Sequence, residues 1–144
     1  MTQTKKTSVD TTIEYLQKWQ DVENKSIAQT TEIIQKTKNS LVKLFMEIIR
    51  HDSIMHHRVQ QFMIDSLTTR PVTLTPEELG EIWSLVEEHI RMEKETGALG
   101  EDLKKSCTLF VQRELLAYLI TDEEKHDKIL AQLERFKNKI YPYA

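Results

Sequence analysis

Cysteine, glycine and proline are all scarce in this chain of 144 residues. The single cysteine, Cys107, excludes a disulfide within the chain and any zinc or iron–sulfur site built from several cysteines. Three glycines and three prolines leave little material for turns, which favours a few long elements. No apolar run approaches the roughly 18 residues that a membrane-spanning helix needs, so we expect no membrane span.

A strong excess of charge of either sign is also lacking. The net charge of −3 provides no general attraction to nucleic acid or anionic lipid, so we expect neither as a partner. Residues 1–9 are rich in Thr and Lys without an apolar run, so we expect a frayed lead rather than a signal peptide, and a cytoplasmic location. A hydrophobic content of 39% beside 30% charged residues is typical of long amphipathic helices, and the length fits one domain.

Apolar residues recur with a helical period in four stretches, which predicts an all-α protein. The helices are expected over about residues 10–38, 40–67, 76 to just past 103, and 107–139. Asp10 or Thr11 is the expected cap of the first helix, and Asn39 with Ser40 marks the second. The sequence Thr75-Pro76-Glu77-Glu78 has the pattern of a capping box at the start of the third helix. Residues 68–75 form the one long connector.

The two halves of the chain repeat one pattern at an offset of 70 residues. This offset relates Asp122 to Asp52, His126 to His56 and Glu93 to Glu23, together with several apolar positions. Each half therefore places a Glu on its first helix and a His 33 residues later on its second (23 to 56, 93 to 126). The pattern predicts two repeated helical hairpins, over about residues 10–67 and 76–140.

A Glu-x-x-His pair lies on the last expected helix. Glu123 and His126 are three residues apart and share a helix face, so both side chains can reach one metal ion. Glu23 and Glu93 lie on the apolar stripes of their helices, where a carboxylate must be neutralised, paired or bound to metal. A Glu at the edge of the core with its head in water is the alternative for Glu23.

This pattern resembles the ferritin-like superfamily, and its rubrerythrin-type members most closely, over roughly residues 10–140. Members of that superfamily form a four-helix bundle that holds two metals with one Glu from each of two helices and a Glu-x-x-His from each of the other two. The resemblance implies a ferritin-like four-helix bundle with these metal ligands: Glu23, His56, Glu93, Glu123 and His126. Ser53 stands where the family has its second bridging Glu.

The resemblance also implies residues that support the ligands. In the family, an Asp four residues before each His accepts a hydrogen bond from the histidine of the opposite half and fixes its tautomer. We therefore expect Asp52 to pair with His126, and Asp122 with His56. His89, one turn before Glu93, is a candidate extra ligand; the alternative is a core histidine that a neighbour satisfies.

The resemblance implies iron as the cofactor, with two ions, or one if Ser53 disables a position; manganese and zinc also suit such ligands. The implied function is an oxidoreductase acting on peroxide, oxygen or ferrous iron. One cysteine provides no ligand set for the iron–thiolate module of full-length rubrerythrins. Enzymatic activity stays open, because a non-enzymatic metal-sequestering or structural bundle, or an interaction protein with paired polar core residues, would give the same pattern.

The connector between the halves has a marginal length. The opposite ends of such a bundle lie roughly 40 Å apart, whereas nine or ten extended residues span about 33 Å at most. Either the helix ends unwind, or two chains exchange hairpins. We expect a homodimer, which could form by such an exchange.

Overall fold

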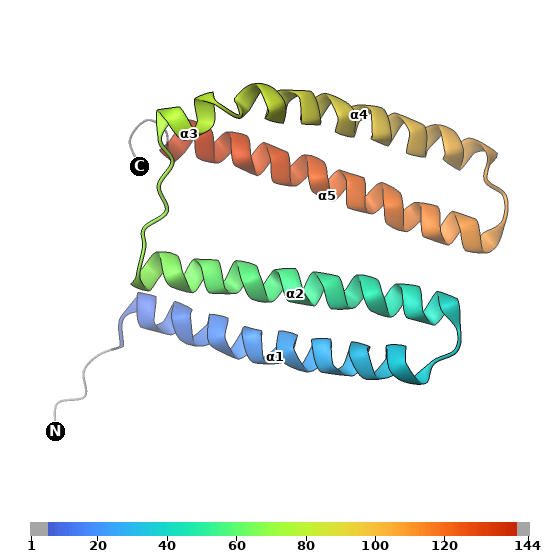
Figure 1. Ribbon diagram of the computed structural model, residues 1–144, viewed down its shortest axis with the longest axis horizontal. Helices are drawn as coiled ribbons and strands as arrows, with labels where there is room; N and C mark the ends of the chain where they lie inside the picture. Colours follow the sequence, from blue (N-terminus) through green and yellow to red (C-terminus); the bar gives the residue numbers. More distant parts are fainter. Residues whose placement is uncertain (1–5, 141–144) are drawn as a thin grey trace. The chain divides into compact units, whose positions relative to one another are not determined.

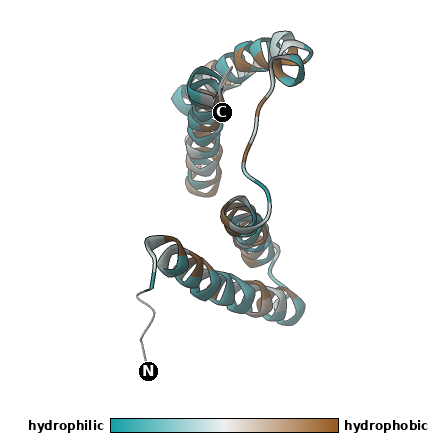
Figure 2. Ribbon diagram, turned by 90° about the vertical axis from the view of Figure 1, so that its left-hand side faces the viewer, coloured by the Kyte–Doolittle hydropathy of each residue, from teal (hydrophilic) through white to brown (hydrophobic). Residues whose placement is uncertain are grey.

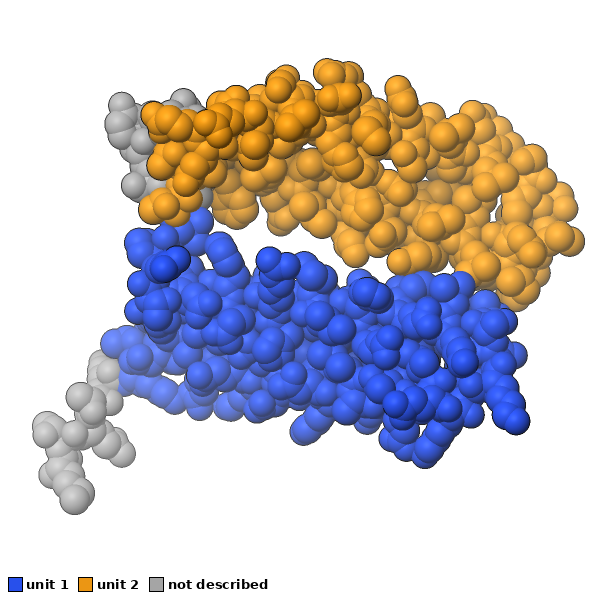
Figure 3. Space-filling view, viewed as in Figure 1, with its two compact units in different colours: residues 1–72 blue, residues 73–144 orange. Residues whose placement is uncertain are grey.

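The computed structural model describes residues 6–140, and within this range the protein is all-helical, as predicted, with no strand. The helices are α1 (Ser8–Lys36), α2 (Ser40–Thr68), α3 (Pro76–Gly80), α4 (Trp83–Ser106) and α5 (Phe110–Ile140) (Figure 1). The chain divides into two compact units, residues 1–72 and 73–144, coloured separately in Figure 3. We call them unit 1 and unit 2. Their division falls inside the predicted connector.

Unit 1 is a helical hairpin in which α1 packs against α2. The two helices are joined by residues 37–39, and the second begins where the sequence predicts. Asn39 caps α2 because its Oδ1 accepts hydrogen bonds from the backbone N–H groups of Leu41 (3.0 Å) and Val42 (3.1 Å). Between the helices, Gln20 Nε2 donates to Gln61 Oε1 over 3.0 Å.

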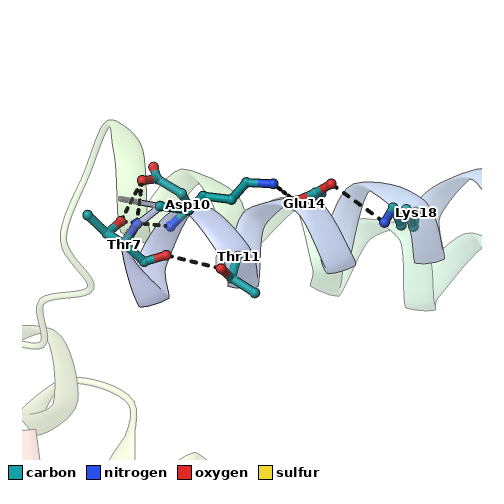
Figure 4. A network of polar contacts seen from close by, with 6 residues as sticks. Thr7, Asp10, Thr11, Glu14 and Lys18 are labelled. Carbon is teal, nitrogen blue, oxygen red and sulfur yellow. Dashed lines mark hydrogen bonds and ion pairs between the residues drawn. The ribbon is translucent and has the colours of Figure 1, made fainter. Parts of the chain in front are cut away.

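The start of α1 differs from the prediction. Thr7 is the N-cap, rather than Asp10 or Thr11, so residues 8 and 9 belong to the helix instead of a frayed lead. The backbone N–H of Asp10 donates to Thr7 Oγ1 and the backbone N–H of Thr7 donates to Asp10 Oδ2, both over 3.1 Å (Figure 4). These bonds form a reciprocal capping box, and the Thr7 hydroxyl and N–H lower the pKa of Asp10 by stabilising its charged form. Glu14 continues the network with ion pairs to Lys6 and Lys18.

Unit 2 contains a second hairpin, in which α4 packs against α5, preceded by the short α3. The predicted capping box of Thr75 and Glu78 is confirmed, with the Thr75 N–H donating to Glu78 Oε2 over 2.8 Å. The prediction of one continuous third helix is wrong, because the chain leaves the helical path after Gly80. Gly has a low helix propensity, and the backbone N–H of Ile82 bonds to Leu79 rather than one residue further back.

The last helix begins later than predicted. α5 starts at Phe110 rather than at Cys107 or Thr108, and residues 107–109 connect it to α4. At the other end of the hairpin, Lys137 Nζ lies 3.8 Å from the centre of the Trp83 ring. This cation–π contact joins the end of α5 to the start of α4.

Burial within the two units is largely polar. Among the described residues, the buried apolar side chains are Leu16, Ile64, Leu79 and Leu116, whereas the buried polar ones are Gln20, Glu23, Thr30, Ser53, Gln60 and Glu93. Many apolar side chains remain exposed on both hairpins, including Val22, Met55, Val59, Phe62, Leu99, Leu119 and Ile129. Figure 2 shows hydrophobic segments along the helices of both units. Each hairpin therefore leaves apolar surface that two helices alone do not bury.

The cap of α1 provides a test of the corrected helix start. Thr7→Ala removes the hydroxyl that accepts the Asp10 N–H, and we expect a loss of about 1 kcal/mol in the free energy of unfolding. Urea denaturation followed by circular dichroism measures it. The matched control is Thr12→Ala, which removes an exposed hydroxyl bonded to the Ser8 carbonyl within the same helix. Equal destabilisation by the two substitutions would contradict the assignment of Thr7 as the cap.

Candidate metal centre

Unit 2 brings three of the predicted metal ligands together. Glu93 comes from α4, and Glu123 and His126 come from successive turns of α5. One donor atom from each of these side chains lies within 4.8 Å of the other two. The predicted Glu-x-x-His pair thus faces the predicted carboxylate across the interface between two helices.

The imidazole of His126 lies among three carboxylates. Its Nδ1 is 3.4 Å from Glu93 Oε1 and 3.6 Å from Glu123 Oε2. On its other side, Nε2 is 3.4 Å from Asp122 Oδ2. A proton on Nε2, held toward Asp122, leaves the lone pair of Nδ1 directed at the two glutamates. That tautomer is the one in which Nδ1 can bind a metal.

Asp122 therefore contacts the histidine of its own helix. The predicted pairs of Asp122 with His56 and of Asp52 with His126 would each join the two units. Both pairs stay predictions, because the chain forms two separate compact units and each unit is described by itself. Asp52 is half-buried on α2, four residues before His56, as the pattern requires.

Glu93 is the most constrained member of the cluster. Only 9% of the residue is exposed, and its Oε1 lies 3.0 Å from His89 Nε2 as well as 3.4 Å from His126 Nδ1. Its Oε2 is buried and has no hydrogen-bond partner in the described part of the chain. A buried carboxylate oxygen without a donor is costly and needs a cation or proton.

The two glutamates share a proton unequally. A hydrogen bond to Glu93 raises the pKa of Glu123, with burial and the negative charge of Glu93 as further causes. The same hydrogen bond lowers the pKa of Glu93, although burial opposes the shift, and the nearby His126 and His89 add to the lowering. Of the two, Glu123 is therefore the carboxyl that binds a proton more readily in the absence of metal, and Glu93 is the one that ionises first.

Unit 1 contains a smaller cluster. His56 Nδ1 lies 3.2 Å from Oε1 of Glu23, a residue that is only 7% exposed. Ser53, at the position of the missing glutamate, is buried and shares a 2.8 Å hydrogen bond with Ser26. Two of the predicted ligands are therefore in contact here, and the third position is filled by a pair of hydroxyls.

Ser26 is a residue that the sequence analysis missed. It lies three residues after Glu23 on α1, so helical spacing places both on one face of that helix. The spacing could have identified Ser26 as a neighbour of the site. The hydrogen bond to Ser53 depends on the packing of α1 against α2, which the spacing alone does not define.

An apolar groove lies beside Glu123 within unit 2. Its volume is about 450 Å³, and its lining includes Leu99, Leu103, Leu116, Leu119 and Ile120. Gly100 allows α4 to approach α5 here, since an added Cβ would lie only 3.3 Å from Ile120 Cγ1.

Among the described helices, none has an apolar stretch of the length that a membrane span requires.

Comparison with protein-family models, curated proteins and solved structures found no match to this chain. The class that the structure defines is an all-helical protein with a cluster of carboxylates and imidazoles between two helices. The ferritin-like resemblance accordingly depends on the residues and their spacing.

The shared proton predicts the effect of Glu123→Gln on the metal-free protein. The raised pKa of Glu123 stabilises the fold at low pH, and this contribution is lost as the pH rises through that pKa. Folding lowers the pKa of Glu93, so its carboxylate stabilises the fold at pH values above its pKa in the unfolded chain. This stabilisation is lost as the pH falls through the lowered pKa of the folded protein. Above the raised pKa of Glu123 both carboxyls are ionised and repel, whereas a glutamine amide can donate to Glu93 without charge. We expect Glu123→Gln to raise the melting temperature by about 1–3 °C in alkaline solution, above that pKa.

Thermal denaturation in the presence of a chelator measures this shift. The gain should disappear as the pH falls below the raised pKa of Glu123, where the protonated carboxyl of the wild type already donates. The control is Glu124→Gln, which removes the neighbouring exposed carboxylate on α5. A lower melting temperature for Glu123→Gln in alkaline solution, or a gain that Glu124→Gln reproduces, would contradict the shared proton.

Proposed function

We propose that this chain is a metal-binding protein of the ferritin-like type, in which Glu93, Glu123 and His126 bind a divalent first-row metal. The observation that carries the proposal is the buried Glu93 carboxylate, which has one oxygen without a donor and lies beside a second glutamate and a histidine. A divalent cation would neutralise both carboxylates and use the free oxygen.

The geometry of the cluster supports this proposal. Ligand atoms about 2.0–2.2 Å from one ion lie at most about 4.4 Å from each other. The donor atoms of Glu93, Glu123 and His126 already lie within 4.8 Å, so small side-chain rotations would complete the coordination. Two carboxylates and an imidazole suit Fe(II), Mn(II) and Zn(II).

With iron bound, we propose an oxidoreductase that acts on peroxide, oxygen or ferrous iron, because iron supplies one-electron redox chemistry. The residues of the chain have defined tasks in this proposal. Glu123 would release its proton when metal binds, and Asp122 would hold His126 in its ligating tautomer. The groove beside Glu123 leaves room for a small oxidant at the site.

A non-enzymatic role is the second candidate. Ser53, which is hydrogen-bonded to Ser26, replaces a bridging carboxylate of the family and reduces the ligand set of unit 1. A centre with fewer ligands suits sequestration of metal or a structural zinc ion. A plain interaction bundle is less well supported, because it leaves Glu93 Oε2 without a donor. We place the protein in the cytoplasm in each case.

Metal content tests the proposal. We expect the full chain purified from iron-supplemented cells to retain metal, and Glu93→Gln, Glu123→Ala and His126→Ala each to weaken binding by about 100-fold or more, since loss of a supporting residue alone typically costs 10–100-fold. Elemental analysis and isothermal titration measure this. Glu124→Gln and His51→Ala are the controls, because both remove exposed side chains on the helices that carry the clusters.

Redox activity then separates the two candidates. Iron-loaded protein that is oxidised by hydrogen peroxide, with absorbance changes at the iron, supports the oxidoreductase. Tightly bound zinc without any such reaction supports the structural or sequestering role. Absence of metal even after reconstitution would overturn both and leave an interaction protein.

We also propose a homodimer. Each hairpin exposes apolar side chains that need a covering surface, and the described connector between α2 and α3 has only residues 69–75. Sedimentation should give twice the mass of one chain. If hairpin exchange builds the dimer, ten Gly and Ser residues inserted after Val72 should shift the protein toward monomer. A wild-type monomer at all concentrations would contradict the dimer.

A further inference from the structure

The two units do not hold the same set of donor groups. The 70-residue offset relates Glu93 to Glu23 and His126 to His56, and both of these Glu–His pairs are in contact, over 3.4 and 3.2 Å respectively. Each unit therefore has one carboxylate and one imidazole at equivalent places. The units differ at two further positions near this pair, which unit 2 fills with His89 and Glu123.

At both remaining positions, unit 1 has lost the metal donor that unit 2 carries. Ser53 corresponds to Glu123, and its hydroxyl is already used by Ser26 at 2.8 Å. Trp19 corresponds to His89, and an indole offers no lone pair to a metal. Unit 1 thus retains two donors where unit 2 has four.

The buried glutamates differ in the same direction. Glu23 and Glu93 are almost equally buried, at 7% and 9% exposed. Of the two, Glu93 alone has a buried oxygen without a hydrogen-bond partner within the described range. The cluster of unit 2 therefore has a carboxylate oxygen that a cation could neutralise, whereas the described Glu23–His56 pair has no such oxygen.

His89 completes the surroundings of Glu93. Its Nε2 lies 3.0 Å from Glu93 Oε1, the same oxygen that His126 Nδ1 approaches from α5. About half of the His89 side chain is exposed within its unit. His89 does not belong to the group of donors within 4.8 Å of one another, so its ring must turn to reach the ion that Glu93, Glu123 and His126 would hold. Two imidazoles thus approach the buried carboxylate from the two helices of one hairpin.

We infer that unit 2 alone holds a single metal ion through His89, Glu93, Glu123 and His126, and that unit 1 provides no ligand. The inference depends on the proposed metal-binding function and specifies its ligand set and stoichiometry. Two imidazoles and two carboxylates complete the tetrahedral shell of Zn(II), or leave two positions open on an octahedral Fe(II) or Mn(II). The Glu23–His56 pair is then a structural hydrogen bond between α1 and α2.

Titration of the metal-free full chain with Co(II) tests the inference. Co(II) is the probe because its visible absorption reports the ligands. We expect one ion per chain. His89→Gln should weaken binding by about 10-fold or more and alter the visible spectrum. The matched variant Glu23→Gln/His56→Gln removes the equivalent pair of unit 1 and should change neither the stoichiometry nor the spectrum.

The wild type provides a measurement that does not depend on the folding of a variant. In proton NMR of the Co(II)-loaded chain, the ring protons of His89 and His126 should show large paramagnetic shifts, and those of His56 should not. Ser53→Glu should create a third donor in unit 1 and raise the stoichiometry toward two ions.

The outcomes separate the inference from the proposed function. Two ions in the wild type, shifted His56 protons, or lost binding in Glu23→Gln/His56→Gln with an unaffected His89→Gln would overturn the inference and keep the metal-binding function. Absence of Co(II) and Zn(II) binding in the wild type would overturn both.

Discussion

The structure of unit 2 depends on the burial of one carboxylate. Glu93 lies between α4 and α5 with one oxygen near two imidazoles, and its other oxygen has no donor among residues 6–140. Removing a charge from water is costly unless other groups or a cation replace the lost hydration. The groups around Glu93 respond to that cost: two histidines approach it, and Glu123 keeps a proton more readily than usual. A metal ion would satisfy all of these groups together.

The distribution of polar and apolar residues explains why a hairpin is not a complete fold here. The helix–helix interfaces contain buried Gln, Glu, Ser and Thr, whereas many large apolar side chains face outward. Buried apolar area is the main source of stability, so these outward faces need a covering surface. The proposed ferritin-like bundle and the proposed exchanged dimer are two ways to provide such a surface.

Much of the local structure was predictable, because it depends on short-range chemistry. The helical class, the cap at Asn39 and the capping box at Thr75 follow from periodicity or spacing, and the ferritin-like resemblance implied the meeting of Glu93 with His126. The predictions were wrong at helix ends, where weak conformational preferences compete. Thr7, the N-cap of α1, lies in a polar segment without an apolar pattern, and one glycine, Gly80, did not by itself indicate the end of α3. The hydrogen bond between Ser26 and Ser53 and the assembly of the hairpins depend on packing between helices, which a repeat does not specify.

The three-residue connections within the two hairpins, residues 37–39 and 107–109, have a kinetic consequence. Helix–helix contacts within one hairpin join residues closer in sequence than contacts between hairpins would, so they require less loop-closure entropy and form earlier. All four donor groups of unit 2 lie between residues 89 and 126. The proposed centre could therefore assemble as soon as this one hairpin closes, before any slower encounter of hairpins or chains. Under the proposed function, metal capture and formation of the proposed dimer would then be separate, ordered events.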